Sequence, residues 1–368
     1  MNYLKFRSAF KIQHPKFNIL FLGFGFLIAS CHNTNVKSNQ EVKAADSASK
    51  QHGDTIADRI SFYTARVNRN PNDANAYWNR GKLEALGKNL GPALGDLTKA
   101  VMIDSTKAEY FFSLADIDFA TGHTHEARDA FETCIRLNPK NTEAILKLAE
   151  LYFYVKKYPE AIDLIDNAIK INPYLAKEYF LKGMIFMEKR DTALAISSMK
   201  TAVEQDPKYF LAYIQLGVIF ASKGNPLALN YYNTAIQLQP QNSEPYYDKG
   251  LFYQFGGDYD DALKAYGEIM QVDSVYQLPD TLCKHAYYNM GDIYFENKND
   301  YSKSLDCFNQ AIKSDTNYFM AYYGRANCYE KLNQPDKALA DYAHSFNLNH
   351  SFKEAAKSYK RLKSQNHK

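Results

Sequence analysis

The chain has 368 residues, 46% hydrophobic and 14% aromatic, so it is long and apolar enough to bury a core. Its 29 Tyr and 23 Phe against one Trp are a skew that a repeated, Tyr-rich motif would explain. The formal net charge is +3, yet residues 1–30 contain four basic and no acidic side chains, which leaves 40 basic against 41 acidic side chains elsewhere. Such a balance offers no electrostatic footprint for nucleic acid, so we exclude nucleic-acid binding.

Residues 1–30 are predicted to be a signal peptide and no part of the fold. A positive stretch over 5–16 precedes an apolar run over 17–29. That run is shorter than the roughly 20 apolar residues of a membrane-spanning helix, and it fits the core of a secretory signal. It ends in an aliphatic residue, two small residues and Cys31, an order that resembles the lipobox of bacterial lipoproteins.

The lipobox resemblance implies cleavage before Cys31 and three acyl chains on that cysteine, enough for stable anchoring where one chain is marginal. The alternative is an uncleaved N-terminal anchor in which Cys31 is incidental. Residues 31–53 are polar and are predicted to form a flexible tether. His32 stands where an Asp would resemble an inner-membrane retention signal, so we expect the outer membrane. The lack of an acidic cluster after it favours the side that faces the periplasm.

Residues 74–352 are predicted to contain eight copies of one unit. The spacing from Gly81 to Ala93 and Ala100 recurs from Gly183 to Ala195 and Ala202. Six units have 34 residues, the fifth has one fewer and the seventh one more. The units are 74–107, 108–141, 142–175, 176–209, 210–242, 243–276, 284–318 and 319–352, with an insertion at 277–283.

Each unit contains two stretches with apolar residues three and four apart, which predicts a pair of amphipathic helices. The unit 210–242 carries the pattern as Tyr213, Leu216, Gly217, Phe220, Ala228, Tyr232, Ala235 and Pro240. This pattern resembles the tetratricopeptide repeat (TPR). The resemblance implies an all-α fold, a right-handed α-solenoid superhelix of helix pairs in which stacked neighbours build the core.

Small residues are expected where the two helices of a pair approach closely, Gly183 with Ala195 and Gly217 with Ala228. The turns between units are marked by Pro139, Pro173, Pro207 and Pro240. Residues 54–73 are predicted to be a degenerate half repeat with a lone helix over 56–69, and 353–368 a capping helix. The insertion either lengthens the following helix, with Pro279 in its first turn, or forms a plain loop.

The sequence does not favour catalysis, a metal or a cofactor. Of the cysteines other than Cys31, Cys134 replaces a core alanine, and Cys307 and Cys328 lie on adjacent predicted helices where core packing is favoured over pairing. His123 and His125 have metal-like spacing, but they fall in a turn without a third ligand nearby, which favours solvated side chains. Phosphate-binding and hydrolase motifs are not found.

In the TPR family the fifth and twelfth residues of each unit point towards the concave face, which implies a groove for a peptide. The fifth residues are Trp78, Phe112, Leu146, Phe180, Ile214, Tyr247, Tyr288 and Tyr323. The twelfth residues include Phe119, Phe153, Met187 and Phe295. An acidic edge is expected from Glu109, Asp116, Glu143 and Glu150. The alternative is that these bulky side chains are common at such positions and partly buried between units.

We expect Trp78 to be partly exposed and to contribute to binding with little role in stability, whereas Tyr77 takes the core position. The sequence thus predicts a non-catalytic scaffold or adaptor that binds a protein or peptide and reaches the membrane through its lipid. The rival interpretations are an accessory subunit of an envelope enzyme or of a secretion or assembly complex, and a cryptic envelope hydrolase with its site in the insertion.

Overall fold

The computed structural model describes residues 55–276 and 282–366, and every regular element in these ranges is an α-helix. The chain divides into two compact parts, residues 55–206 and residues 207–366. The first part contains α4 (Ile56–Arg69), α5 (Ala74–Leu86), α6 (Leu90–Ile103), α7 (Ala108–Ala120), α8 (Thr124–Leu137), α9 (Thr142–Tyr154), α10 (Tyr158–Ile171), α11 (Ala176–Glu188) and α12 (Thr192–Gln205).

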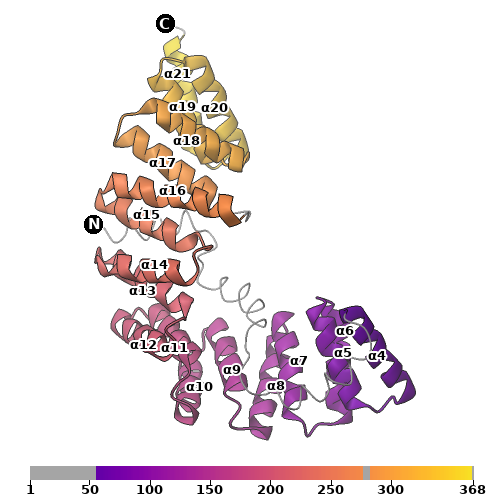
Figure 1. The fold of residues 1–368 in the computed structure, drawn as a ribbon. Coiled ribbons are helices and arrows are strands. Elements are labelled where there is room, and N and C mark those ends of the chain that lie inside the picture. The colour runs from indigo at the N-terminus through magenta and orange to yellow at the C-terminus, as the bar shows by residue number, and fades with distance from the viewer. Residues whose placement is uncertain (1–54, 277–281, 367–368) are drawn as a thin grey trace. The chain divides into compact units, whose positions relative to one another are not determined.

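The second part contains α13 (Phe210–Ser222), α14 (Leu227–Leu238), α15 (Glu244–Gly256), α16 (Tyr259–Tyr276), α17 (Cys283–Glu296), α18 (Tyr301–Ser314), α19 (Phe319–Lys331), α20 (Pro335–Leu348) and α21 (Lys353–Asn366). Figure 1 shows these helices following one another as antiparallel pairs. The predicted all-helical array of repeated helix pairs is confirmed.

Several helices begin at a polar side chain that caps the first turn. Asp73, Asn141, Asp191 and Asp300 each accept a hydrogen bond from the backbone N–H three residues later, at 2.9–3.1 Å. Such a cap satisfies one of the N–H groups that the first helical turn leaves without a partner. The local sequence therefore determines where these helices begin before any packing is considered.

One residue in the turn inside each pair has a left-handed backbone. In the first part these residues are Lys88, Gly122, Lys156 and Arg190, and in the second part Gly224, Gly257, Asn299 and Asn333. Glycine adopts this conformation without cost, whereas a lysine or arginine there is strained. Because lysine and arginine adopt the left-handed conformation here despite its cost, we infer that the short connection between the two helices imposes this turn geometry.

Glycines allow the two helices of a pair to pack closely. A Cβ atom added to Gly183 would lie 3.3 Å from the carbonyl oxygen of Ala195 and 2.7 Å from Cγ of Met199, so the expected approach of Gly183 to Ala195 is present. At Gly217 the nearest atoms belong to the ring of Tyr232, one turn beyond the expected Ala228. An aromatic ring on the second helix thus takes the volume that the glycine leaves.

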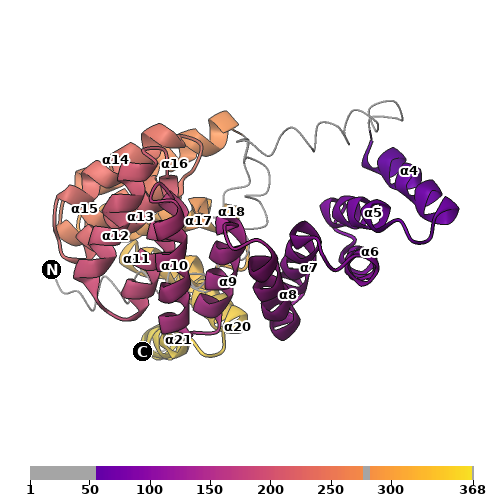
Figure 2. The same ribbon diagram turned by 90° about the horizontal axis from the view of Figure 1, so that it is seen from below.

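Within each part the first helices of successive pairs also contact one another, α5 with α7, α7 with α9 and α9 with α11, then α13 with α15 and α17 with α19. We call the surface formed by these helices the first-helix face of each part. Figure 2 shows α4 to α9 in chain order, with each pair stacked against the next. The first-helix face is the surface on which the predicted binding residues are placed.

The two end segments contain helices where the sequence predicts them, whereas the segment around the insertion differs from the prediction. The helices α4 and α21 occupy the segments expected to hold a lone helix and a capping helix. At the insertion, α16 runs to Tyr276 and reaches 18 residues, and α17 begins at Cys283. The extra helical length therefore belongs to the preceding helix, because nothing before Pro279 stops it. Pro279 itself lies outside the described residues.

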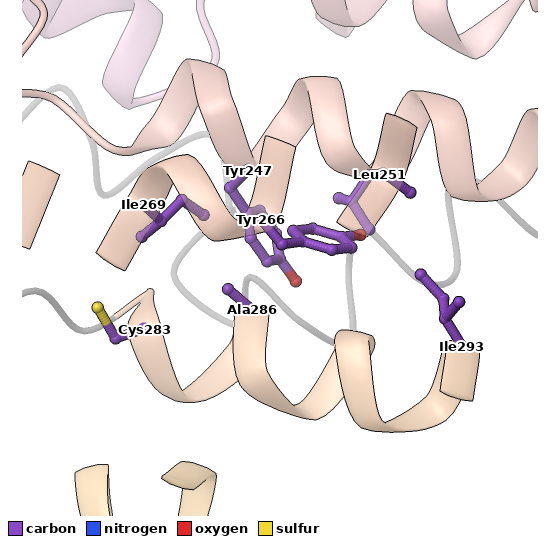
Figure 3. Packing of buried hydrophobic residues seen from close by; sticks show 8 residues of the cluster. Tyr247, Leu251, Tyr266, Ile269, Cys283, Ala286 and Ile293 are labelled. Atoms are coloured by element: carbon purple, nitrogen blue, oxygen red, sulfur yellow. The ribbon is translucent and has the colours of Figure 1, made fainter. Parts of the chain in front are cut away.

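A polar bridge fastens the core between α15, α16 and α17. The ring centroids of Tyr247 and Tyr266 lie 5.7 Å apart. Figure 3 shows both rings above Ala286 of α17. The side-chain amide of Asn289 donates to the hydroxyl of Tyr247 at 3.2 Å and to that of Tyr266 at 3.1 Å. These two buried tyrosines thus keep their hydroxyls hydrogen-bonded while their rings fill the space between the helices.

Candidate functional site

The twelve residues predicted to line a groove differ in exposure. Leu146, Phe119, Ile214 and Tyr247 are buried, with 6%, 7%, 1% and 0% of their surface exposed. These four belong to the core and present no surface to a partner in this structure. The other eight are half-buried: Trp78, Phe112, Phe153, Phe180, Met187, Tyr288, Phe295 and Tyr323.

The half-buried rings are held from behind by other rings. Phe112 packs edge-on against Phe131 of α8 at 6.0 Å between centroids. Tyr323 lies 5.5 Å from Tyr342 of α20 and 5.1 Å from Phe352. Each ring is thus packed on one side and keeps part of its surface exposed. The alternative that these bulky side chains are partly buried between units therefore holds for part of each side chain.

Trp78 is half-buried and tied to the next repeat. Its indole N–H donates to Oγ of Ser113 on α7 at 2.8 Å, and its ring lies 5.4 Å from Tyr110. The ammonium of Lys82 lies 4.2 Å from the centre of the ring, within the range of a cation–π contact. These contacts correct the expectation that Trp78 has little role in stability. Tyr77, placed in the core by the sequence, is also half-buried.

Acidic side chains occupy the first-helix face of the first part. Lys147 of α9 lies 3.9 Å from Asp116 and 3.2 Å from Glu150, so this lysine is shared between two carboxylates. Glu178 of α11 is buried, with 3% of its surface exposed, and burial raises its pKa to about 7, helped by the charges of Glu150 and Glu143. Glu178, which the sequence analysis did not single out, is therefore a buried acid close to Glu143 and Glu150 of the predicted acidic edge.

A second acidic group, in the second part, was also missed. Glu244 and Asp248 lie one helical turn apart on α15, and Tyr232 of α14 is near them. Neither carboxylate oxygen of Asp248 nor the hydroxyl of Tyr232 has a hydrogen-bond partner among the described residues. Burial raises the pKa of Asp248 well above its usual range, and the charge of Glu244 raises it further. The sequence shows two acids four residues apart, but it does not show that they are buried.

The cysteines and histidines do not form a reactive site in the described chain. Cys134, Cys307 and Cys328 are free thiols, and Cys328 donates to Oγ of Ser304 at 3.1 Å. Burial raises the thiol pKa to about 11 in Cys134 and Cys328 and to about 12 in Cys307. These values disfavour the reactive thiolate at neutral pH.

His123 lies in a turn, with half of its side chain exposed and Nδ1 3.5 Å from Asp118. Between residues 55 and 276 and between 282 and 366, no three His, Cys, Asp or Glu side chains gather as a metal site would require. The same ranges contain no helix that is both long and apolar enough to span a bilayer. Cys31, the predicted lipidation site, lies outside the described residues.

Comparison with known families decides the relationship that the repeated pairs indicate. Family models described as tetratricopeptide repeat match residues 118–174, 176–209, 241–317 and 307–340. The chain belongs to the tetratricopeptide-repeat family. Tetratricopeptide repeats are a protein-interaction fold, and the first-helix face of each part carries some of this chain's half-buried aromatic residues.

Two known proteins resemble a short part of the chain. It is 30% identical to serine/threonine-protein phosphatase 5 of Rattus norvegicus and of Homo sapiens over 85 residues, which are 23% of this chain and 17% of the phosphatase. The chain therefore spans less than a fifth of the length of these relatives, and their catalytic activity is not transferred to it.

Two solved structures extend the comparison. The C-terminal part of a TPR repeat-containing protein from Cytophaga hutchinsonii is similar with a TM-score of 0.56 at 20% identity, over 67% of this chain and 98% of that one. YrrB, described as a TPR protein with an unusual peptide-binding site, is similar with a TM-score of 0.40 at 26% identity, over 50% of this chain and 95% of that one. The Cytophaga structure supports the shared fold.

Proposed function

We propose that this chain is a non-catalytic scaffold that binds a partner protein or peptide on its first-helix face. We further propose that lipid on Cys31 anchors it to a bacterial outer membrane, on the side that faces the periplasm. The observation that carries the binding proposal is the row of half-buried aromatic and apolar side chains on successive first helices.

The packing behind these side chains suits them to recognition. Because Phe112 and Tyr323 are fixed by rings on the second helices, a partner that covers their exposed edges need not order them first. Rigid aromatic side chains supply contact area at a low cost in conformational entropy, and such anchors dominate binding energy at protein interfaces.

The test is affinity capture from envelope extracts with matched variants. Met187→Ala removes a half-buried apolar side chain from α11, on the first-helix face, whereas Met102→Ala removes a side chain that is 74% exposed on α6, a second helix. We expect a partner to be retained by the wild type and by Met102→Ala, and to be lost with Met187→Ala and Phe112→Ala. Equal retention by all four proteins would place the binding surface elsewhere.

The anchoring proposal has its own test. In cells grown with labelled palmitate, Cys31→Ser should carry no label and should accumulate as the uncleaved precursor. The proposal rests on the order of residues that ends at Cys31. A Cys31→Ser protein that still incorporates the label would contradict it, whatever the outcome of the capture experiment.

A further inference from the structure

The second part contains two buried residues, Asp248 and Tyr232, whose three side-chain oxygen atoms have no hydrogen-bond partner among the described residues. Asp248 of α15 is 1% exposed and Tyr232 of α14 is fully buried, and neither carboxylate oxygen nor the tyrosine hydroxyl makes a hydrogen bond within the described residues. Glu244, one turn before Asp248 on the same face of α15, is half-buried. We call these three residues the acidic site.

Groups of this kind are rarely left unsatisfied. A buried polar group without a hydrogen bond costs free energy, and a buried carboxylate is normally paired with a cation or coordinates a metal. The charged group that acts on Asp248 is a second acid, Glu244, which raises its pKa. Burial raises the pKa of Glu244 to about 7 as well. A cation beside the two acids would favour their ionised forms.

The repeat does not require an acid where Asp248 stands. In the other units the sixth residue is neutral or basic, and Asp248 is the acidic exception. The sixth residues are Asn79, Ser113, Lys147, Leu181, Gln215, Asp248, Asn289 and Gly324. Since seven units build the same helix without an acid at this place, packing alone does not account for it.

The chemistry of the site selects a compact cation. Two carboxylates and a hydroxyl offer acceptors for the three N–H donors of a primary ammonium group. A calcium ion needs six to eight oxygen ligands, more than these side chains supply. A lysine places its ammonium on a flexible four-carbon stem, which can reach a carboxylate below the surface, whereas a planar guanidinium needs a wider opening.

We propose that Glu244, Asp248 and Tyr232 bind the ammonium group of a lysine side chain on the partner segment. This inference rests on the proposed protein-binding function and specifies its ligand: a partner with a lysine that enters beside α15. Glu244 keeps part of its surface exposed, whereas Asp248 and Tyr232 are buried. Binding ionises both acids and pairs them with one cation.

The experiment uses n-butylammonium chloride, a lysine side-chain mimic, with the full chain and with sodium chloride at equal ionic strength as the reference. Butylammonium should raise the midpoint of thermal unfolding of the wild type, because a ligand that binds the native state stabilises it. Asp248→Asn should lower its affinity by roughly 10-fold to 100-fold, the range for hydrogen bonds to a charged group. Tyr232→Phe, which retains the ring, should lower the affinity by less.

A matched control separates this site from general charge effects. Asp261→Asn makes the same change at an exposed position of α16 and should leave the butylammonium effect intact. Without ligand, Asp248→Asn should unfold at the same or a higher temperature than the wild type, since it removes an unpaired buried acid. A lower midpoint would show a structural role for the carboxylate and would overturn the proposal. Greater stabilisation by calcium chloride than by butylammonium would overturn it in favour of a metal site.

The partner experiment distinguishes this inference from the proposed function. If a captured partner binds the wild type and Asp248→Asn equally, the acidic site is not where it binds, and protein binding itself stands. If butylammonium stabilises the wild type alone but no partner is captured, the cation site stands and the scaffold function fails.

Discussion

Both oxygens of the Asp96 carboxylate accept a hydrogen bond from the guanidinium of Arg80, each at 2.7 Å. The pair joins α5 to α6, and the same fork joins Arg325 of α19 to Asp341 of α20, at 2.7 and 2.8 Å. In both pairs the side chains are at most 20% exposed and the acid follows the arginine by 16 residues. The same type of bidentate Arg–Asp ion pair thus occurs within two separate helix pairs.

A double-mutant cycle with Arg80→Leu and Asp96→Asn should measure a coupling free energy of about 1–3 kcal/mol, because the pair is bidentate and shielded from water. The exposed pair of Lys298 with Asp260 provides the comparison. Its coupling, measured by urea unfolding in the same way, should not exceed experimental error. Equal couplings for the two pairs would show that burial does not strengthen the fork.

Gly250→Ala should destabilise the second part. The added Cβ would lie 2.5 Å from Cε1 of Tyr266, and that ring is buried and hydrogen-bonded, so it cannot move away. Overpacking of this kind costs about 1–3 kcal/mol. Gly267→Ala in the same unit meets no atom within 4 Å and should stabilise α16 by about 0.5–1 kcal/mol. A stability gain in both variants would contradict the predicted packing.

Lys156→Gly should raise the midpoint of urea unfolding. Lys156 has a φ of 61°. This left-handed conformation costs a non-glycine residue about 1–2 kcal/mol. Glycine avoids that cost, but its greater flexibility in the unfolded chain offsets about 0.5–1 kcal/mol of the gain. Lys99→Gly, at an exposed position inside α6, should lower the midpoint instead, since glycine weakens a helix interior. The prediction fails if both glycines lower it.

Glu178→Gln should change how stability depends on pH. The folded pKa is raised to about 7 from an ordinary value of 4.5, so the protein binds more protons folded than unfolded between these values. The stability conferred by this group is therefore complete below about pH 4.5 and is lost as the pH rises through about 7. As the pH rises from 4.5 to 8, the free energy of unfolding of the variant should increase relative to that of the wild type by up to about 3 kcal/mol.

Thermal unfolding of both proteins across this pH range measures the difference. The exposed neighbour Glu143 gives the control, because Glu143→Gln removes the same charge from the surface of α9. A pH dependence that is the same in Glu178→Gln and in the wild type would show that Glu178 titrates normally.

Partner binding near α5 should shift the emission of Trp78 to the blue. Trp78 is the chain's single tryptophan and keeps part of its indole exposed, so a covering partner excludes water from it. Trp78→Ala should weaken binding and also lower stability by about 1–3 kcal/mol, because the indole bridges α5 and α7. Saturated binding without a spectral shift would show that the partner leaves this end uncovered.

The sequence predicted the helix pairs well because their signals are local. Apolar spacing, the capping residues and Gly183 opposite Ala195 each act over fewer than 20 residues. The binding residues were harder to predict, since register along a helix does not state how far a neighbouring helix covers it. Tyr247 and Tyr323 hold the same place in their units, yet the first is buried beneath α17 and the second keeps an exposed edge.

The acidic site is a second case in which the sequence does not show how far neighbouring helices cover a residue. Glu244 and Asp248 are unremarkable as an acidic pair on a helix, and a solvated face is the ordinary expectation for them. Their burial depends on how α14 and α15 meet and on Tyr232, which belongs to the preceding repeat. No pattern within one unit of sequence carries that information.

The contacts between helices bear on how the protein folds. Every substantial helix contact in the described chain joins a helix to the next one or to the next but one. A chain with such short-range contacts closes no long loops, and topologies of this kind fold rapidly. Within each part, a helix pair can therefore pack onto the one before it as soon as its own residues have been synthesised. The repeats of each part can then fold during synthesis in the order in which they occur along the chain.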